Sequence, residues 1–436
     1  MLFELSEKAE KEVSKYSNEY EIYINQSKTI ELDSKKNELD FAKEEINLGI
    51  GIRVIKNNKI GFAYTTDMNK ITPTVKQAIS NTKLNETDEN FAFSEVNKIK
   101  KVKKLYDPKF DEITLEESIE FLNNIINKAE EEKCEVTSAG FSANKGKTLI
   151  INSNGVSIKD KGTGFGAGLA VNAYKEGELS TAYDSISSRF FDIDGDKLTE
   201  NVCKLAIDSI GGKHIKTEDK EVIFDYHGAT GLLSTFISAF SAENVQRERS
   251  ILKDKIGQEI VDSNLSIIND STLEKGLLSS SADSEGTPSK KTTLVKYGVL
   301  KSFIYDIYTG NKGNHESTSN GYRNSYAGTP SVSPSNIILD FKESVSIEDI
   351  NKGVLATDVL GAHTANPISG DFSVEANNAF IIENGEIKEP IKKAMISGNI
   401  FNILSNCEKI KSETKQYGAF IIPKILMHNL RVVGQY

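Results

Sequence analysis

Cysteine is scarce in this 436-residue sequence, and its spacing excludes two kinds of stabilising site. Cys134, Cys203 and Cys407 lie far apart and form no CxxC pair. A disulfide framework and a cysteine zinc site both need grouped cysteines, so neither is expected. The simplest prediction is a cytoplasmic protein.

Long apolar segments are also missing. No segment approaches the roughly 18 consecutive apolar residues that a membrane-spanning helix needs. The first residues, MLFELSEKAEKEVSKY, lack both the basic segment and the apolar core of a secretory signal. We therefore expect neither a membrane partner nor secretion.

Positive charge is in deficit, because 53 Lys and Arg stand against 63 Asp and Glu, a formal net charge of −10. Binding to nucleic acid needs a clustered excess of Lys and Arg that contacts phosphates, so no nucleic-acid partner is expected. A local basic patch is still compatible with this balance. Its nearest candidate is Lys98–Lys104 (KIKKVKK), which has no interleaved aromatic residues and is interpreted as a solvated linker.

The sequence has few histidines and no serine-nucleophile motif. None of the five histidines lies three or four residues from another, whereas a helical zinc site needs two ligands on one face and a carboxylate beside them. His315-Glu316 begins like such a motif but lies in a Gly/Asn/Ser-rich segment, so we interpret His315 as a loop residue. There is no GxSxG elbow for a nucleophilic serine.

What is present indicates an α+β fold in two domains. Residues 1–215 are predicted to form an N-terminal α/β domain with an antiparallel sheet and helices. Residues 216–436 are predicted to form a mainly antiparallel β domain with one central helix. Asn154-Gly155 is the strongest hairpin signal. The glycines of Gly162–Gly168 (GTGFGAG) follow a strand pattern with no helix after it, which favours a twisted or bulged strand over a phosphate loop.

Hydrophobic spacing and turn signals predict the individual elements. Helices are expected at residues 5–17, 72–82, 114–132, 196–210 and 230–245. Strands are expected at residues 20–26, 29–32, 46–55, 60–65, 136–143, 147–153, 156–174, 179–188, 291–295, 300–308, 336–340, 353–360, 373–382 and 420–427.

The chain is organised around Glu221–Glu259. Apolar residues recur there at helical spacing, namely Leu232, Leu233, Phe236, Ile237 and Phe240. The residues between them make a polar but uncharged face: Ser234, Thr235, Ser238 and Ser241. An ordinary solvent-facing helix would carry Lys and Glu on that face. The pattern alone therefore favours a helix buried between two layers.

Short motifs follow in an order that resembles a known family. These motifs are Asp283–Pro288 (DSEGTP), Lys296–Leu300, Thr309–Asn311, Ser335–Asn336, Ser369–Ser373 (SGDFS), Glu383–Glu386 and Ser397–Asn399. As an ordered set they resemble the C-terminal half of the TldD/PmbA family, the "modulator of DNA gyrase" proteins. From the residues alone, the acidic turn at Asp283–Pro288 could pair carboxylates for acid–base chemistry, but a structural turn is the favoured interpretation.

The central helix distinguishes the two branches of this family. The TldD branch carries a zinc metallopeptidase motif, HExxxH. Here Ser234 stands at the position of the first histidine, Thr235 at that of the glutamate and Ala239 at that of the second histidine. No cysteine in Lys411–Gly418 matches the family's later ligand. The chain therefore looks like the PmbA (TldE) branch.

The resemblance implies a non-catalytic subunit that binds no metal itself. Its partner would be a TldD-like paralogue that holds zinc and cuts extended, unfolded or modified peptides. Residues expected to line a peptide cleft are Ser238, Asp283, Glu285, Gly286, Gly370 and Asp371. One alternative is a homodimeric module that binds peptides or a protein without proteolysis. Another is a self-sufficient peptidase with a relocated zinc site, using His227, His315 or His363.

Overall fold

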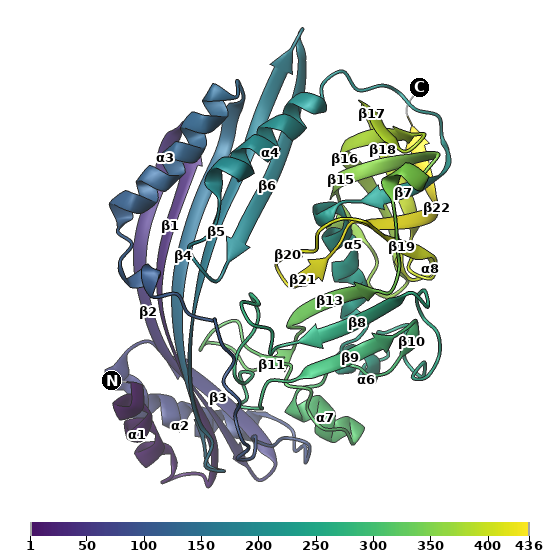
Figure 1. Cartoon of the computed structure of the whole chain (residues 1–436). Helices are drawn as coiled ribbons and strands as arrows, with labels where there is room; N and C mark the ends of the chain where they lie inside the picture. Colours follow the sequence, from purple (N-terminus) through teal and green to yellow (C-terminus); the bar gives the residue numbers. More distant parts are fainter. Residues whose placement is uncertain (1, 435–436) are drawn as a thin grey trace.

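A computed structural model describes residues 2–434. It is mixed α+β, with a long curved sheet on one side and a β-rich C-terminal part on the other (Figure 1). None of the helices within residues 2–434 combines the length and the apolar content that a membrane crossing requires.

The N-terminal sheet is antiparallel throughout, as predicted. Its six strands follow the order β3-β2-β1-β4-β5-β6. They are β1 (Glu19–Lys35), β2 (Glu38–Lys56), β3 (Lys59–Thr65), β4 (Glu135–Asn152), β5 (Ser157–Lys175) and β6 (Glu178–Ser188). The strands predicted at 20–26 and 29–32 are one strand, β1, and those predicted at 136–143 and 147–153 are one strand, β4. The division was wrong because both strands pair on both sides across the polar residues between the predicted pieces.

Two pairs of helices cover one face of this sheet. The helices are α1 (Leu2–Val13), α2 (Ile71–Asn81), α3 (Leu115–Glu131) and α4 (Gly195–Asp208). Ile22 and Ile24 of β1 belong to the core beneath α1 and α2, while Ile30 and Leu32 belong to the core beneath α3 and α4. The start of α3 was predicted from its capping box, which Thr114 and Glu117 form. The sheet therefore carries two separate cores along one face.

The two sequence signals at the β4–β5 hairpin are confirmed. Asn154 and Gly155 make the turn, and Gly155 has a φ of 91°, which favours glycine. The glycine string lies inside β5, where the odd-numbered residues from Thr163 to Ala173 are buried toward the helices. Its glycines therefore face the opposite side of the sheet, and no helix follows them.

The C-terminal part contains a closed barrel and a second sheet. The barrel forms because β22 pairs with β7 as well as with β18, which closes the order β7-β15-β16-β18-β22. Its strands are β7 (Glu218–Phe224), β15 (Lys352–Leu360), β16 (Asp371–Glu383), β18 (Ala394–Asn399) and β22 (Ile425–Gly434), with β14 (Ser344–Val345), β17 (Glu386–Pro390) and β19 (Cys407–Ile410) at the margins. The second sheet contains β10 (Val299–Leu300), β9 (Lys291–Lys296), β8 (Leu265–Asp270), β13 (Asn336–Phe341), β21 (Phe420–Ile422) and β20 (Lys415–Tyr417), and beside it β11 (Gly321–Tyr322) pairs with β12 (Ser331–Val332).

The prediction of a single central helix in this part is wrong. The structure has α5 (Tyr226–Ser238), α6 (Ala242–Gln246), α7 (Ile307–Gly313) and α8 (Ile400–Ile403). Shorter 3-10 turns along the whole chain are η1 (Met68–Lys70), η2 (Thr82–Leu84), η3 (Pro108–Asp111), η4 (Ile347–Asp349) and η5 (Ala362–Thr364). The helix predicted at 230–245 is two helices, and α5 begins earlier because the Asp225 side chain caps it.

Two predicted strands of the C-terminal part also need correction. The strand expected at 300–308 ends at Leu300, and Asp306 with Thr309 forms a capping box that begins α7. The strand expected at 420–427 is divided at Pro423, with β21 in the second sheet and β22 in the barrel. Proline has no amide hydrogen to donate, so it marks the point where the chain leaves one sheet for the other.

Candidate functional site

Helix α5 lies between the barrel and the second sheet, as the sequence pattern predicted (Figure 1), although Ser234 on its uncharged face is exposed. Leu232, Leu233, Phe236 and Ile237 are buried in the large core that both sheets share. The ring of Phe236 also packs against Phe401 of α8, with ring centroids 5.5 Å apart. The helix is therefore a fixed part of the framework.

The uncharged face of α5 uses its hydroxyl groups within the helix. The Oγ atom of Ser234, which is exposed, donates to the carbonyl oxygen of Thr230 at 2.8 Å. The Oγ atom of Ser238 donates to the carbonyl oxygen of Thr235 at 2.7 Å. Such bonds back to the preceding turn satisfy a hydroxyl without any outside partner.

The positions of the family's metal motif do not fit zinc in this chain. Zinc in proteins takes imidazole nitrogen, thiolate sulfur or carboxylate oxygen. Ser234 and Thr235 offer neutral hydroxyls, and Ala239 offers a methyl group that is only 1% exposed, just past the end of α5. Within residues 2–434, no group of three or more His, Cys, Asp or Glu side chains is arranged to hold a metal ion.

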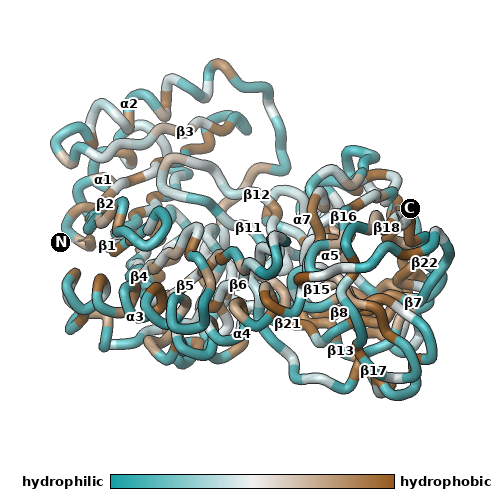
Figure 2. The backbone as a smooth tube through the Cα atoms, turned by 90° about the horizontal axis from the view of Figure 1, so that it is seen from above, coloured by the Kyte–Doolittle hydropathy of each residue, from teal (hydrophilic) through white to brown (hydrophobic). Residues whose placement is uncertain are grey.

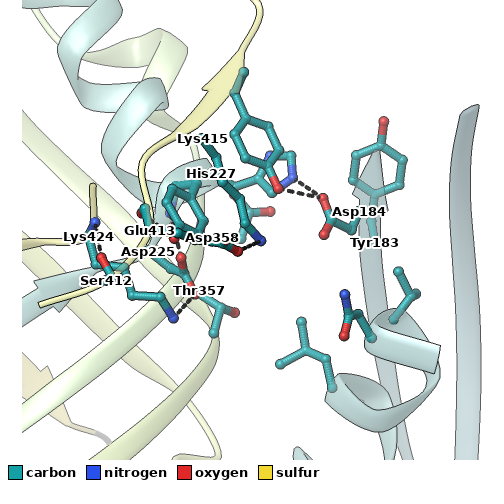
Figure 3. A pocket seen from close by; sticks show the side chains of 15 residues that line it. Tyr183, Asp184, Asp225, His227, Thr357, Asp358, Ser412, Glu413, Lys415 and Lys424 are labelled. Atoms are coloured by element: carbon teal, nitrogen blue, oxygen red, sulfur yellow. Dashed lines mark hydrogen bonds and ion pairs between the residues drawn. The ribbon is translucent and has the colours of Figure 1, made fainter. Parts of the chain in front are cut away.

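The first turn of α5 opens on a cavity of about 440 Å³ between β6 and the C-terminal part (Figure 3). We call it the interdomain cavity. Its lining residues are Tyr183, Asp184, Asn201, Val202, Leu205, Asp225, Tyr226, His227, Thr357, Asp358, Ser412, Glu413, Lys415, Tyr417 and Lys424. The segment Lys411–Gly418, in which the family's cysteine ligand was sought, thus contributes a wall of this cavity.

A histidine and an aspartate meet across the interdomain cavity. The Nε2 atom of His227 lies 2.7 Å from Oδ1 of Asp184 (Figure 3). The Tyr417 hydroxyl donates to the same oxygen at 3.2 Å. Burial lowers the pKa of His227, but the hydrogen bond with Asp184 and the charges of Asp184, Asp358 and Asp225 outweigh burial and raise it overall. His227 therefore binds a proton more readily in the folded chain than a free histidine does, and its contact with Asp184 joins the two parts of the chain.

The remaining charged groups of the cavity differ in whether they are paired. Lys424 pairs with Asp225 at 2.7 Å, and Lys415 pairs with Glu413 at 3.2 Å. Asp358 forms no ion pair with the described residues, and burial raises the pKa of its carboxyl group. The cavity thus offers a carboxylate and several hydroxyls to a ligand that carries hydrogen-bond donors.

Two free sheet edges border the interdomain cavity. Among the described strands, β6 pairs only with β5, and β20 pairs only with β21. Tyr183 and Asp184 lie on β6, while Lys415 and Tyr417 lie on β20. A free strand edge exposes backbone N–H and C=O groups to which an extended peptide can add as a further strand.

The acidic turn at 283–288 has the structural role favoured from the sequence. The carboxylate of Asp283 accepts hydrogen bonds from the backbone N–H groups of Glu285 at 3.0 Å, Thr287 at 2.9 Å and Gly321 at 3.0 Å. Asp283 is 1% exposed, and Gly286 is buried with a φ of 86°. The turn therefore fixes backbone geometry.

Glu285 belongs to a buried ionic cluster between the two parts of the chain. Arg53 contacts Glu285 at 3.5 Å and forms a two-point pair with Glu21 at 2.9 and 2.6 Å. Arg323 also pairs with Glu21, and both side chains are fully buried. Burial raises the pKa of both Asp283 and Glu285. Both carboxyl groups contact protein groups here and not solvent.

The motif Ser369–Ser373, which holds two of the residues predicted to line a peptide cleft, lies beside α8. Gly370 is buried with a φ of 83°, and Asp371 is exposed. The carboxylate of Asp371 accepts hydrogen bonds from Asn399 and Ser369, both at 2.8 Å, and these bonds lower its pKa. None of the six residues predicted to line a peptide cleft belongs to the interdomain cavity. Their contact with a peptide stays a prediction.

The three histidines considered for a relocated zinc site lie in different elements. His227 is in α5 and lines the interdomain cavity. His315 follows α7, is exposed and packs near Tyr305, with ring centroids 5.0 Å apart. His363 is exposed in η5. The structure does not bring them together.

Models of three domains of one protein family match most of the chain. Residues 217–434 match the PmbA/TldA metallopeptidase C-terminal domain, residues 20–82 match domain 1, and residues 108–210 match the central domain. The chain belongs to the PmbA/TldD metallopeptidase family. The resemblance inferred from the ordered motifs is therefore confirmed.

Individual similar proteins agree with this assignment. An uncharacterized protein of Methanocaldococcus jannaschii is 35% identical over 94% of this chain and 95% of its own length. The metalloprotease PmbA of Escherichia coli O157:H7 is 23% identical over 88% of this chain and 86% of its own length. The crystal structure of TldE from Thermococcus kodakarensis superimposes with a TM-score of 0.93 at 26% identity, covering 99% of this chain and 100% of that chain.

The interdomain cavity of this PmbA/TldD member was largely missed from the sequence. Asp184, Asp358 and Tyr417 come from three distant segments, and nothing in their local patterns marks them. Only Asp225, Tyr226 and His227 adjoin the helix that the sequence singled out. Of these, only His227 had been considered, as one ligand of the alternative relocated zinc site.

Proposed function

We propose that this chain is a PmbA/TldE-like, non-catalytic subunit of a two-chain zinc metallopeptidase. Its partner is a TldD-like paralogue that holds the zinc and cuts unfolded or modified peptides. The observation that carries the proposal is the composition of α5, where Ser234, Thr235 and Ala239 replace the metal-motif residues. The three cysteines are free and buried, which agrees with a cytoplasmic location.

The role proposed for this chain is to hold an extended peptide. The free edges of β6 and β20 supply backbone hydrogen bonds, which depend little on peptide sequence. The carboxylate of Asp358 and the neighbouring hydroxyls receive donor groups of the peptide. The buried core around α5 keeps the wall of the interdomain cavity rigid. The bound peptide is then held in a fixed position for cleavage by the partner.

The test is a reconstitution with the HExxxH-bearing paralogue from the same genome. Each purified chain, and their mixture, is assayed for cleavage of an unfolded polypeptide with and without a chelator. We expect cleavage by the mixture that a chelator abolishes, and co-elution of the two chains as a complex. Zinc should be found in the purified paralogue and not in this chain alone. Glu→Gln in the paralogue's motif is the matched control and should abolish cleavage while leaving the complex intact. Chelator-sensitive cleavage by this chain alone would contradict the proposal.

The second candidate is a homodimeric module that binds peptides or a protein client without proteolysis. It is favoured by the interdomain cavity and its two sheet edges, because one chain supplies all of them. Size-exclusion chromatography with light scattering separates the two candidates. A stable homodimer that does not exchange with the paralogue, yet binds extended peptide, would support this second function.

A further inference from the structure

The helix-covered face of the N-terminal sheet has a gap between its two cores. Successive side chains of a strand alternate between its faces, so the even-numbered residues of β1 share the helix side. Ile24 lies in the core beneath α1 and α2, and Ile30 lies in the core beneath α3 and α4. Lys28 lies between them on the same face, where neither core covers the sheet. Gaps of this kind expose a sheet face directly to solvent.

Lysines fill this gap from several neighbouring segments. Lys145 and Lys147 of β4 and Lys159 and Lys161 of β5 lie on the same face as Lys28, as their register shows. The linker before α3 crosses beside them. Together they form a hollow of about 570 Å³, the basic hollow, lined by Lys101, Val102, Lys104, Leu105, Tyr106, Lys147, Lys159, Asp160, Lys161 and Ser281. A neighbouring hollow adds Lys28 and Lys145.

The arrangement places like charges directly opposite each other. Lys28 faces Lys145 across β1 and β4, and Lys147 faces Lys161 across β4 and β5. Like charges in such cross-strand pairs destabilise a sheet. The first pair is compensated, because Lys28 pairs with Glu44 at 3.0 Å and Lys145 pairs with Asp111. Whether the basic hollow carries unpaired positive charge therefore depends on the second pair, Lys147 and Lys161.

The second pair is not held in an ion pair, although Lys147 lies close enough to Asp111 for its charge to help lower the pKa of that carboxyl group. Neither Lys147 nor Lys161 forms an ion pair with any residue of the described range 2–434. The Nζ atom of Lys161 lies 3.5 Å from the centroid of the Tyr106 ring. Asp160, the acidic residue of the lining, accepts hydrogen bonds from the backbone N–H groups of Ser281 at 2.7 Å and Lys161 at 2.9 Å. Lys104 of the lining pairs with Glu274 at 2.7 Å, so among the described residues the lysines of the hollow without an ion pair are Lys101, Lys147, Lys159 and Lys161. They gather in a chain whose net charge is −10.

We propose that the basic hollow binds a compact oligophosphate, the shared chemistry of inorganic polyphosphates and nucleoside triphosphates. The described lining contains lysine and no arginine, so it supplies summed point charges and not the planar fork that suits a carboxylate. A single-stranded nucleic acid would need an open aromatic platform for its bases. The ring of Tyr106 faces Lys161, and its hydroxyl binds Asp111, so it offers no such platform.

The test is calorimetric titration of the full chain with inorganic tripolyphosphate and, separately, with ATP at constant ionic strength. The double variant Lys147→Gln/Lys161→Gln should weaken tripolyphosphate binding by about tenfold or more, because two of the charges that meet the phosphates are gone. The control variant Lys76→Gln/Lys83→Gln removes two exposed lysines of α2 and η2. Its net charge therefore equals that of the Lys147→Gln/Lys161→Gln variant. Its affinity should equal that of the unaltered chain. Tighter binding of ATP than of tripolyphosphate would identify a nucleotide, and the reverse an inorganic phosphate chain.

A thermal readout keeps the proposal testable without relying on the heat of binding. Tripolyphosphate should raise the melting temperature of the unaltered chain and of the control variant, but not that of Lys147→Gln/Lys161→Gln. Without ligand, the double variant should melt no lower than the unaltered chain, because its like-charge pair has been relieved. Three results would overturn the proposal: no binding at millimolar ligand, equal weakening in both variants, or tighter binding of a single-stranded oligonucleotide than of tripolyphosphate.

Discussion

At Gly370 the chain adopts a conformation that only glycine fits. Its φ is 83°, and a Cβ atom there would lie 2.3 Å from the ring of Phe401. Positive φ alone costs an L-residue roughly 1–2 kcal/mol. We expect Gly370→Ala to lower the free energy of unfolding by about 2–4 kcal/mol, since overpacking adds to this strain. Urea denaturation followed by circular dichroism measures the change.

Gly418 provides the matched control for Gly370. Its φ is 55°, and a Cβ atom there would meet nothing within 4 Å. Gly418→Ala should therefore cost only the backbone part, about 1 kcal/mol. If both substitutions cost the same, the contact of Gly370 with Phe401 is not what makes glycine necessary.

The His227–Asp184 pair makes stability depend on pH in a definite direction. The pKa of His227 is raised in the folded chain, so the folded state binds this proton more tightly than the unfolded state does. The stabilisation is therefore complete below the ordinary histidine pKa of about 6.5 and is lost as pH rises through the folded-state value. We expect the free energy of unfolding of the unaltered chain to be about 1 kcal/mol larger than that of His227→Gln at acidic pH. At alkaline pH the difference should be smaller.

Urea titrations at several pH values measure this difference in free energy of unfolding. His363→Gln is the control, because His363 is exposed in η5. That variant should track the unaltered chain at every pH. A difference for His227→Gln that grows with pH would contradict the assigned pairing.

At the scale of elements, sequence patterns predicted the features that depend on neighbouring residues, such as caps and turns. They failed for features that depend on distant pairing partners, such as the length of a strand. The capping box of Thr114 and Glu117 and the turn at Asn154-Gly155 need only neighbouring residues, and both were predicted. The length of β1 depends on β2 and β4, which pair with it beyond its apolar residues. Helix α7 was not predicted, because the strand expected at 300–308 ran into its first turn and the residues after it were expected to form a connection.

The candidate site shows the same division. Helix α5 and its uncharged face were predicted from spacing, and the burial of its apolar stripe is confirmed. The interdomain cavity was not predicted, since Asp184 and Tyr417 meet only after two separate sheets have formed and docked. Likewise, the lysines of Lys98–Lys104 were predicted as a solvated linker, and the structure places Lys101 and Lys104 at the basic hollow.

The face of α5 also yields a prediction at this scale. Because the Ser234 hydroxyl bonds only within its own helix, Ser234→Ala should change the free energy of unfolding by less than about 0.5 kcal/mol. Alanine's higher helix propensity favours a slight gain. Peptidase activity of the reconstituted pair should also stay unchanged. A loss of activity with stability intact would show that this hydroxyl contacts substrate or partner.

At the scale of the whole molecule, a buried ionic cluster holds the two parts together. The N-terminal sheet supplies Glu21 and Arg53, and the C-terminal part supplies Glu285 and Arg323. Figure 2, which views the molecule from above, shows these parts as two bodies in contact along one side. Buried charges are costly unless paired, so each member of this cluster depends on the others.

This dependence predicts how the two parts respond to loss of one charge. Arg323→Ala leaves Glu21 with a single buried partner and should lower the free energy of unfolding by about 3–5 kcal/mol. Arg431→Ala breaks an exposed pair with Asp219, at 3.2 Å, and should cost at most about 1 kcal/mol. Glu21→Gln combined with Arg323→Met removes both charges, so its cost should fall below the sum of the single changes. If instead the costs add, Glu21 and Arg323 contribute to stability independently of each other.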